Sequence, residues 1–151
     1  MDYIDDYLFD GVRVLLGEDG TVTTDDGHPV LQYVWGKYWV NNHAHVIKSA
    51  GVFPLEAIYI ALSQTSASEL ITGAVQPKIN QKNLRSLTLR MPDPSELAFL
   101  DPLFHCYRTH EEEIRCLRRL RDTLLPKLMS GEINVSEIKP PTPPNNHLCA
   151  Y

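Results

Sequence analysis

The chain has 151 residues, of which 43% are hydrophobic, and a formal net charge of −5 at pH 7. This length is too short for two ordinary domains, so we expect one small core with an extended helical arm. No stretch approaches the roughly 20 uninterrupted apolar residues of a membrane span, and MDYIDD lacks the basic and apolar regions of a secretory signal. We therefore expect a soluble, cytoplasmic protein.

The charge is distributed unevenly along the chain. Residues 1–36 carry eight acidic side chains against one basic, residues 37–90 six basic against two acidic, and residues 91–138 six basic against nine acidic. The overall acidity argues against a nonspecific coat on nucleic acid. Only the middle segment could face phosphate groups without strong repulsion.

The three cysteines, Cys106, Cys116 and Cys149, form no CxxC pair and leave an odd number. On one helix, Cys106 and Cys116 would lie about 15 Å apart, which is beyond the reach of a disulfide or a shared metal ion. We therefore expect reduced, buried or incidental thiols.

The first third of the chain predicts short strands joined by turns. GVRVLLGEDG, HPVLQYVWG and KYWVNNHAHVIK each combine β-branched and aromatic residues with Gly, Asp or Asn. Next, Leu55, Ile58, Tyr59 and Leu62 recur at helical spacing behind Pro54, which predicts one short buried helix. SQTSASELITG is small and polar, which predicts a loop.

The segment QPKINQKNLRSLTLRMP predicts a turn of helix followed by a strand. Asn80 can cap the turn, which would run through Leu84. Apolar and polar residues then alternate in SLTLR, the pattern of a strand with one buried face.

After Pro92 an apolar ladder steps alternately by three and four residues, which is the spacing of a heptad seam. The predicted partner interface consists of Leu103, Tyr107, His110, Ile114, Leu117, Arg121, Leu124 and Leu128. Because two of these residues are polar, we expect an imperfect coiled coil that specifies a register or a partner. Asp-Pro at 101–102 should start or kink this helix, and Ser-Gly at 130–131 should end it.

Two polar groups are candidates for contact with DNA. The first follows an aromatic strand and comprises Lys37, Asn41, Asn42, His43 and His45. His43 and His45 share one face if the strand continues, but two histidines without further ligands at matching spacing make a poor metal site. A structural polar network beside the sheet and contact with DNA are both open, and the two are compatible.

The second group is the densest cluster of amide and cationic side chains in the chain. It comprises Gln76, Lys78, Asn80, Gln81, Lys82, Asn83 and Arg85. Gln and Asn can pair with adenine, Arg and Lys with guanine, and either kind with phosphate. Taken alone, such a cluster on an exposed turn is more often simply solvated, and the surrounding sequence strengthens the case for contact with DNA.

Catalytic signatures are lacking. The acidic pairs at 5–6, 18–19 and 25–26 could hold a metal as in a nuclease, but no lysine lies close behind them and acidic turns are usually solvated. The sequence contains neither a Gly-rich phosphate loop nor a GxSxG motif. We therefore expect no catalysis, no cofactor and no metal, with a small metal-dependent nuclease as the least favoured interpretation.

Several segments, in order, carry a family resemblance: DYIDDYLFDG, GEDG, GKYWVNNHAHVI, ITGAVQPKINQKNL, a Met-Pro pair at 91–92 and LRDTLLPKLMSGEI. Over roughly residues 2–135 the chain resembles the specificity subunit of type I restriction-modification enzymes. The resemblance implies an α+β fold with a partial target recognition domain over residues 1–92 and a spacer helix over 93–131. Residues 132–151, which include four prolines in KPPTPPNNHLCAY, form an expected disordered tail.

The resemblance also implies partners. In the family, two recognition domains each read half of a bipartite sequence in double-stranded DNA, while two antiparallel helices hold them apart and seat the methyltransferase subunits. This chain carries the unit once, which predicts a non-catalytic half-subunit that forms a homodimer through its helix, or a gene remnant. It would work with methyltransferase and restriction subunits. The alternative is an assembly module that binds methyltransferase or specificity subunits through its helix without useful DNA affinity.

Two segments depart from the family pattern. The family's recognition domain normally has a further segment before the DYIDDYLFDG-like stretch, so we expect some strands and DNA-facing loops to be missing. MPDPSELAFLDP replaces the family's glutamine-rich start of the spacer helix.

Overall fold

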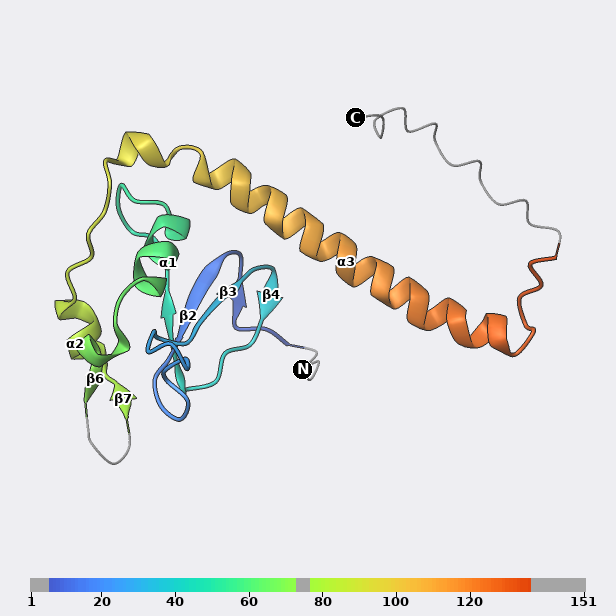
Figure 1. The fold of residues 1–151 in the computed structure, drawn as a ribbon, viewed down its shortest axis with the longest axis horizontal. Coiled ribbons are helices and arrows are strands. Elements are labelled where there is room, and N and C mark those ends of the chain that lie inside the picture. The colour runs from blue at the N-terminus through green and yellow to red at the C-terminus, as the bar shows by residue number, and fades with distance from the viewer. Residues whose placement is uncertain (1–5, 73–76, 137–151) are drawn as a thin grey trace. The chain divides into compact units, whose positions relative to one another are not determined.

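The computed structural model describes residues 6–72 and 77–136. Within these ranges the chain has an α+β fold, with small antiparallel sheets followed by a long C-terminal helix, as the sequence predicts (Figure 1). It divides into two compact units, Met1–His105 and Cys106–Tyr151. Gln76, Cys149 and most of the expected tail lie outside the described residues.

The central sheet consists of three antiparallel strands in the order β3-β2-β5. These are β2 (Arg13–Gly17), β3 (Leu31–Val34) and β5 (Ala44–Ile47). Val14 and Leu16 of β2 are fully buried while the residues between and beside them are partly exposed, because alternate side chains of a strand point to opposite faces. The prediction of short strands in this part of the chain is confirmed.

Two smaller antiparallel pairs accompany the central sheet. β1 (Phe9–Asp10) pairs with β4 (Lys37–Tyr38), and β6 (Ile71–Thr72) pairs with β7 (Lys78–Ile79). Each of these strands has only two residues, so the pairs depend on contacts with the rest of the domain for stability.

The predicted short helix is α1 (Leu55–Ser63), which begins directly after Pro54. It buries Leu55, Ala57 and Leu62 and contacts β2 and β3 (Figure 1). Its buried Glu56 accepts a hydrogen bond of 2.7 Å from the Tyr33 hydroxyl group of β3, which compensates part of the cost of burying a carboxylate. The helix therefore packs through apolar contacts and at least one polar contact.

The main core is formed by Leu16, Val22, Leu70 and Ile79. Leu70 closes the 3-10 helix η1 (Ala67–Glu69), and β6 begins at the next residue. The sequence predicts only a loop for this stretch, and that prediction is wrong. Small and polar residues dominate the segment, but the buried Leu70 folds it against the sheet.

Helix α2 (Gln81–Ser86) has the predicted cap, since the Asn80 side chain accepts a hydrogen bond of 2.7 Å from the Asn83 N–H group. The predicted strand after this helix is not formed. Within the described residues, 87–92 pair with no other strand, although they keep the alternation of half-buried and exposed side chains. A strand requires a hydrogen-bonding neighbour as well as a pattern, and here the neighbour is lacking.

The short helix η2 (Pro94–Leu97) precedes the long helix α3 (Leu100–Met129), which has 30 residues. The Asp93 side chain caps η2, and hydrogen bonds from the Ser95 side chain and N–H group lower the pKa of Asp93. α3 ends at the predicted Ser-Gly stop, where Gly131 adopts a φ of 76°. In the part of the chain that the structure describes, no helix has the length and apolarity to cross a membrane.

The cap of α2 gives a test of how firmly this helix is held. We expect Asn80→Ala to lower the free energy of unfolding by about 1 kcal/mol, because it leaves a helix N–H group without its acceptor. Gln81→Ala, at the neighbouring exposed position, is the control and should change it by less than about 0.5 kcal/mol. Urea denaturation followed by circular dichroism measures both, and equal effects of the two substitutions would contradict the capping role.

Candidate DNA interface

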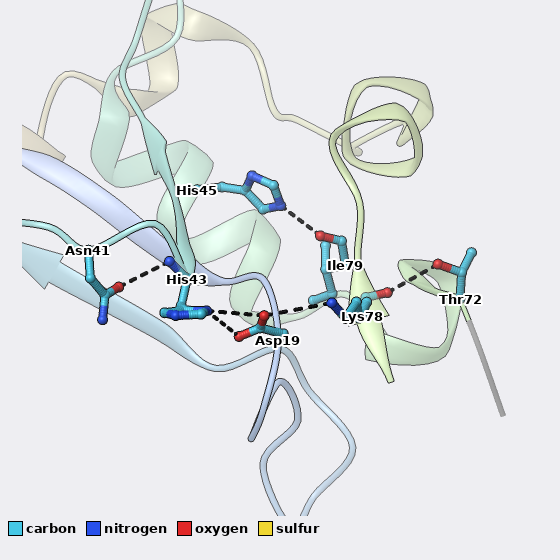
Figure 2. Close-up of polar contacts among 7 residues, drawn as sticks. All are labelled: Asp19, Asn41, His43, His45, Thr72, Lys78 and Ile79. Atoms are coloured by element: carbon cyan, nitrogen blue, oxygen red, sulfur yellow. Dashed lines mark hydrogen bonds and ion pairs between the residues drawn. The ribbon is translucent and has the colours of Figure 1, made fainter. Parts of the chain in front are cut away.

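The β6–β7 hairpin is attached to the central sheet through Ile79 (Figure 2). The Ile79 side chain is fully buried, and its N–H group donates to the Glu18 carbonyl oxygen at 2.9 Å. Its own carbonyl oxygen accepts a hydrogen bond of 2.7 Å from His45 Nε2. Because both main-chain groups and the side chain are engaged, Ile79 fixes the hairpin relative to β2 and β5.

A second connection is made by Asp19, in the turn after β2, which lies between His43 and Lys78 (Figure 2). Its carboxylate oxygens are 2.9 Å from His43 Nδ1 and 3.8 Å from Lys78 Nζ. The side chains of His43 and Lys78 are 56% and 53% exposed, so solvent screens both pairs and neither contributes much stability. Asn41 supports this group, since its Oδ1 accepts a hydrogen bond from the His43 N–H group at 3.1 Å.

The structure therefore brings the two predicted polar groups together at one edge. His43 and His45 reach Asp19 and Ile79, and Lys78 reaches the same Asp19. Both histidines belong to a polar network beside the sheet, as one of the two interpretations predicts, and their contact with DNA stays a prediction. Asn42 is exposed in the same turn.

Lys37 does not join this edge. It lies on β4, in a different sheet, and its Nζ is 4.7 Å from the centroid of the Tyr7 ring. This cation–π contact gives Lys37 a local structural partner.

Within the amide and cation cluster, the two asparagines serve the fold. Asn80 caps α2 and donates through Nδ2 to the Thr72 hydroxyl group at 3.2 Å, while Asn83 Nδ2 donates to the Leu70 carbonyl oxygen at 3.2 Å. The exposed members are Lys78, Gln81, Lys82 and Arg85. Among the described residues, the side chains of Gln81, Lys82 and Arg85 have no hydrogen-bond or ion-pair partner. These three side chains are available to a ligand.

Asp19 is the residue that sequence reasoning missed. The acidic pair at 18–19 predicts a solvated turn, yet the Asp19 side chain is only 31% exposed and contacts two of the predicted site residues. Its partner His43 lies 24 positions away, and no local pattern indicates such a pairing. Over residues 6–72 and 77–136, no cluster of three or more His, Cys, Asp or Glu side chains could hold a metal ion.

Comparison with known proteins identifies the family. A profile of the type I restriction modification DNA specificity domain matches residues 1–117. The chain belongs to this family. Specificity subunits of the family are non-catalytic components of restriction-modification complexes. The expected family resemblance is thus confirmed.

This specificity domain is also 26% identical, over 91 residues, to a Haemophilus influenzae protein provisionally named a type I restriction enzyme specificity subunit. The match covers 60% of this chain and 23% of that protein, so the chain spans about a quarter of its relative's length. No solved structure gives a significant match to the chain.

In the specificity domain, helix α3 exposes the predicted apolar ladder. The apolar ladder positions Leu103, Tyr107, Ile114, Leu117, Leu124 and Leu128 are all between 37% and 56% exposed. The polar ladder positions His110 and Arg121 are exposed too. Leu120, Leu125 and Met129, which the ladder omits, widen the exposed apolar surface. A surface of this kind is typical of an interface with another protein.

The histidine network gives a test of which histidine anchors the β6–β7 hairpin. We expect His45→Ala to lower the free energy of unfolding by about 1–3 kcal/mol, because the carbonyl oxygen of buried Ile79 loses its donor. His43→Ala is the matched control and should cost less than about 1 kcal/mol, since the His43–Asp19 pair is exposed. Urea denaturation measures both; a larger effect at His43 would show that the anchor is wrongly assigned.

Proposed function

We propose that the chain is a DNA-recognition component of a type I restriction-modification system, acting in the cytoplasm with methyltransferase and restriction subunits as partners. Residues 1–92 would read DNA, and the segment over residues 93–131, which contains α3, would act as spacer and dimer interface. Family membership supports the DNA role. One observation carries the proposal. The exposed Gln81, Lys82 and Arg85 lie on α2, and the cap of this helix, Asn80, directly follows the buried Ile79.

The chemistry of this edge suits duplex DNA. Side chains three and four positions apart lie on one face of a helix, so Lys82 and Arg85 share a face, as do Gln81 and Arg85. A guanidinium group can pair with guanine and an amide with adenine, while lysine neutralises phosphate. A short helix that presents one amide and two cations can therefore combine base contact with backbone contact. The exposed Asn41, Asn42 and His43 lie on the neighbouring turn and extend this proposed surface.

Asp19 limits what Lys78 can contribute to binding of DNA phosphates. Its carboxylate already faces Lys78 at 3.8 Å and would repel a phosphate group at the same place. We therefore assign the main phosphate contacts to Lys82 and Arg85, with Lys78 as a secondary contact.

The DNA proposal predicts a specific salt dependence. We expect the double substitution Lys82→Ala and Arg85→Ala to weaken binding to duplex DNA and to reduce the log-log salt slope by about 2, because two phosphate contacts are lost. Arg118→Ala with Arg119→Ala removes the same charge from α3 and should leave the slope nearly unchanged. Fluorescence anisotropy with labelled duplexes at several salt concentrations measures both variants.

The alternative is an assembly module with no useful DNA affinity, and the exposed apolar ladder of α3 favours it specifically. If the unsubstituted chain binds no duplex even at low salt, the DNA proposal fails and the assembly module is favoured. Similar losses in both double variants would instead show that binding follows overall charge.

For α3 we propose that the ladder pairs with a second copy of the chain or with a companion specificity subunit. Leu117→Glu should place a charge in the seam and abolish self-association, because the carboxylate replaces apolar packing with a group that would have to be buried without a partner. Cys116→Glu introduces the same charge at an exposed neighbour outside the ladder and is the control. Light scattering gives the molar mass; a dimer that survives Leu117→Glu contradicts the seam.

A further inference from the structure

The fold already uses most of the amide side chains that the sequence assigns to DNA contact. Asn41 Oδ1 accepts a hydrogen bond of 3.1 Å from the His43 N–H group. Asn80 caps α2 through its Oδ1 and donates through its Nδ2, and Asn83 Nδ2 donates at 3.2 Å to a main-chain carbonyl oxygen. Turning any of these three amides toward a base would therefore break a hydrogen bond of the fold.

Gln81 and Asn42 are the two amides of the predicted groups that stay free. Both side chains are exposed, and over residues 6–72 and 77–136 neither has a hydrogen-bond or ion-pair partner. Gln76, the remaining amide, lies outside the described residues. A bidentate contact with adenine uses both atoms of an amide, because the nitrogen donates to N7 while the oxygen accepts from the N6 amino group. Gln81 and Asn42 retain both atoms for such a contact.

The charges around these two amides differ. Gln81 shares α2 with two exposed cations, Lys82 and Arg85, which have no partner in the described part of the chain. The turn that carries Asn42 lies beside the Asp19 carboxylate, which is 2.9 Å from the ring of the next residue, a histidine. Phosphate contacts hold a duplex in register while a base is read, and a carboxylate repels phosphate. The surroundings therefore favour Gln81 over Asn42 as the residue that reads a base.

The main chain at Gln81 is also held in place. Gln81 is the first residue of α2, directly after the cap residue Asn80. Ile79, one position earlier, is fully buried and has both of its main-chain groups hydrogen-bonded. A bidentate contact needs two aligned hydrogen bonds at once, so it is best made from a rigidly positioned residue.

We propose that Gln81 is the specificity-determining residue of the DNA surface and reads adenine, while Lys82 and Arg85 contact phosphates. This inference rests on the proposed function and adds to it the base and the residue that recognises it. Gln81 carries no charge, so its removal changes which sequences are bound and leaves the phosphate contacts in place.

Selection of duplexes from a randomised library by the 151-residue chain, followed by sequencing, tests the assignment. The unsubstituted chain should enrich adenine over the other bases at least about fivefold at one or more positions. Gln81→Ala should abolish this preference at one position. Gln81→Glu has nearly the same size but cannot donate to adenine N7, so it should lose the same preference.

Asn42→Ala is the matched control, because it removes a free amide outside α2, and it should keep the adenine preference. Fluorescence anisotropy with labelled duplexes gives the log-log salt slope of each variant. Gln81→Ala should change this slope by less than about 0.5, whereas loss of one phosphate contact changes it by about 0.9. Thermal melting followed by circular dichroism checks that each variant is folded.

Three results would overturn this inference and leave the DNA role standing. The first is that Gln81→Ala selects the same sequences as the unsubstituted chain, or that Asn42→Ala loses the adenine position instead. The second is that Gln81→Ala lowers the salt slope by about 0.9, the loss expected for a phosphate contact. The third is that the unsubstituted chain binds duplexes without any sequence preference. If it binds no duplex even at low salt, the proposed function fails, and this inference fails with it.

Discussion

The placement of Ile79 is the constraint on which the position of the exposed Gln81, Lys82 and Arg85 depends. A hairpin with two residues in each strand has too little pairing to persist by itself. Burial of one isoleucine side chain contributes about 1.5–3 kcal/mol to the free energy of folding. The two main-chain hydrogen bonds of Ile79 fix the orientation of the hairpin on the sheet, because hydrogen bonds require a defined geometry. Because Asn80 follows immediately and caps α2, the orientation of that helix is determined by the same anchor.

This arrangement makes the proposed DNA surface compatible with the acidity of the chain. Most of the acidic excess lies in residues 1–36, which include the β2 strand and its turn. At the junction with the hairpin, Asp19 is engaged by His43 and Lys78, so part of that negative charge is neutralised locally. The exposed Gln81, Lys82 and Arg85 follow the cap at Asn80, within residues 37–90, which carry six basic side chains against two acidic. The local charge and the anchored position of α2 thus both favour the exposed surface of this helix as the proposed DNA contact.

The sequence predicts those features that depend on local chemistry. Alternating apolar residues predict strand β2, and helical spacing behind Pro54 predicts α1. The cap residue Asn80 predicts the start of α2, and the Ser-Gly pair ending at Gly131 predicts the end of α3. Each of these signals lies within a few residues of the element that it specifies.

Features that depend on distant partners could not be predicted. His45 bonds to a carbonyl group 34 positions away, and Asp19 contacts both His43, in the turn before β5, and Lys78 of β7. Residues 87–92 carry the pattern of a strand, but pairing is decided by whether a neighbour is present, which no local pattern records. Leu70 is surrounded in sequence by small polar residues, so its burial became evident only in the fold.

Amide hydrogen exchange of the Ile79 N–H group tests most directly whether Ile79 couples the β6–β7 hairpin, and with it the proposed DNA surface, to the core sheet. If the coupling holds, this amide opens only with the sheet and shows protection close to that of Leu16 and His45, which pair in β2 and β5 two residues from the Glu18–His43 hydrogen bond. Exchange of Ile79 at the rate of an exposed turn, while Leu16 and His45 stay protected, would show that the hairpin moves independently and would contradict the account.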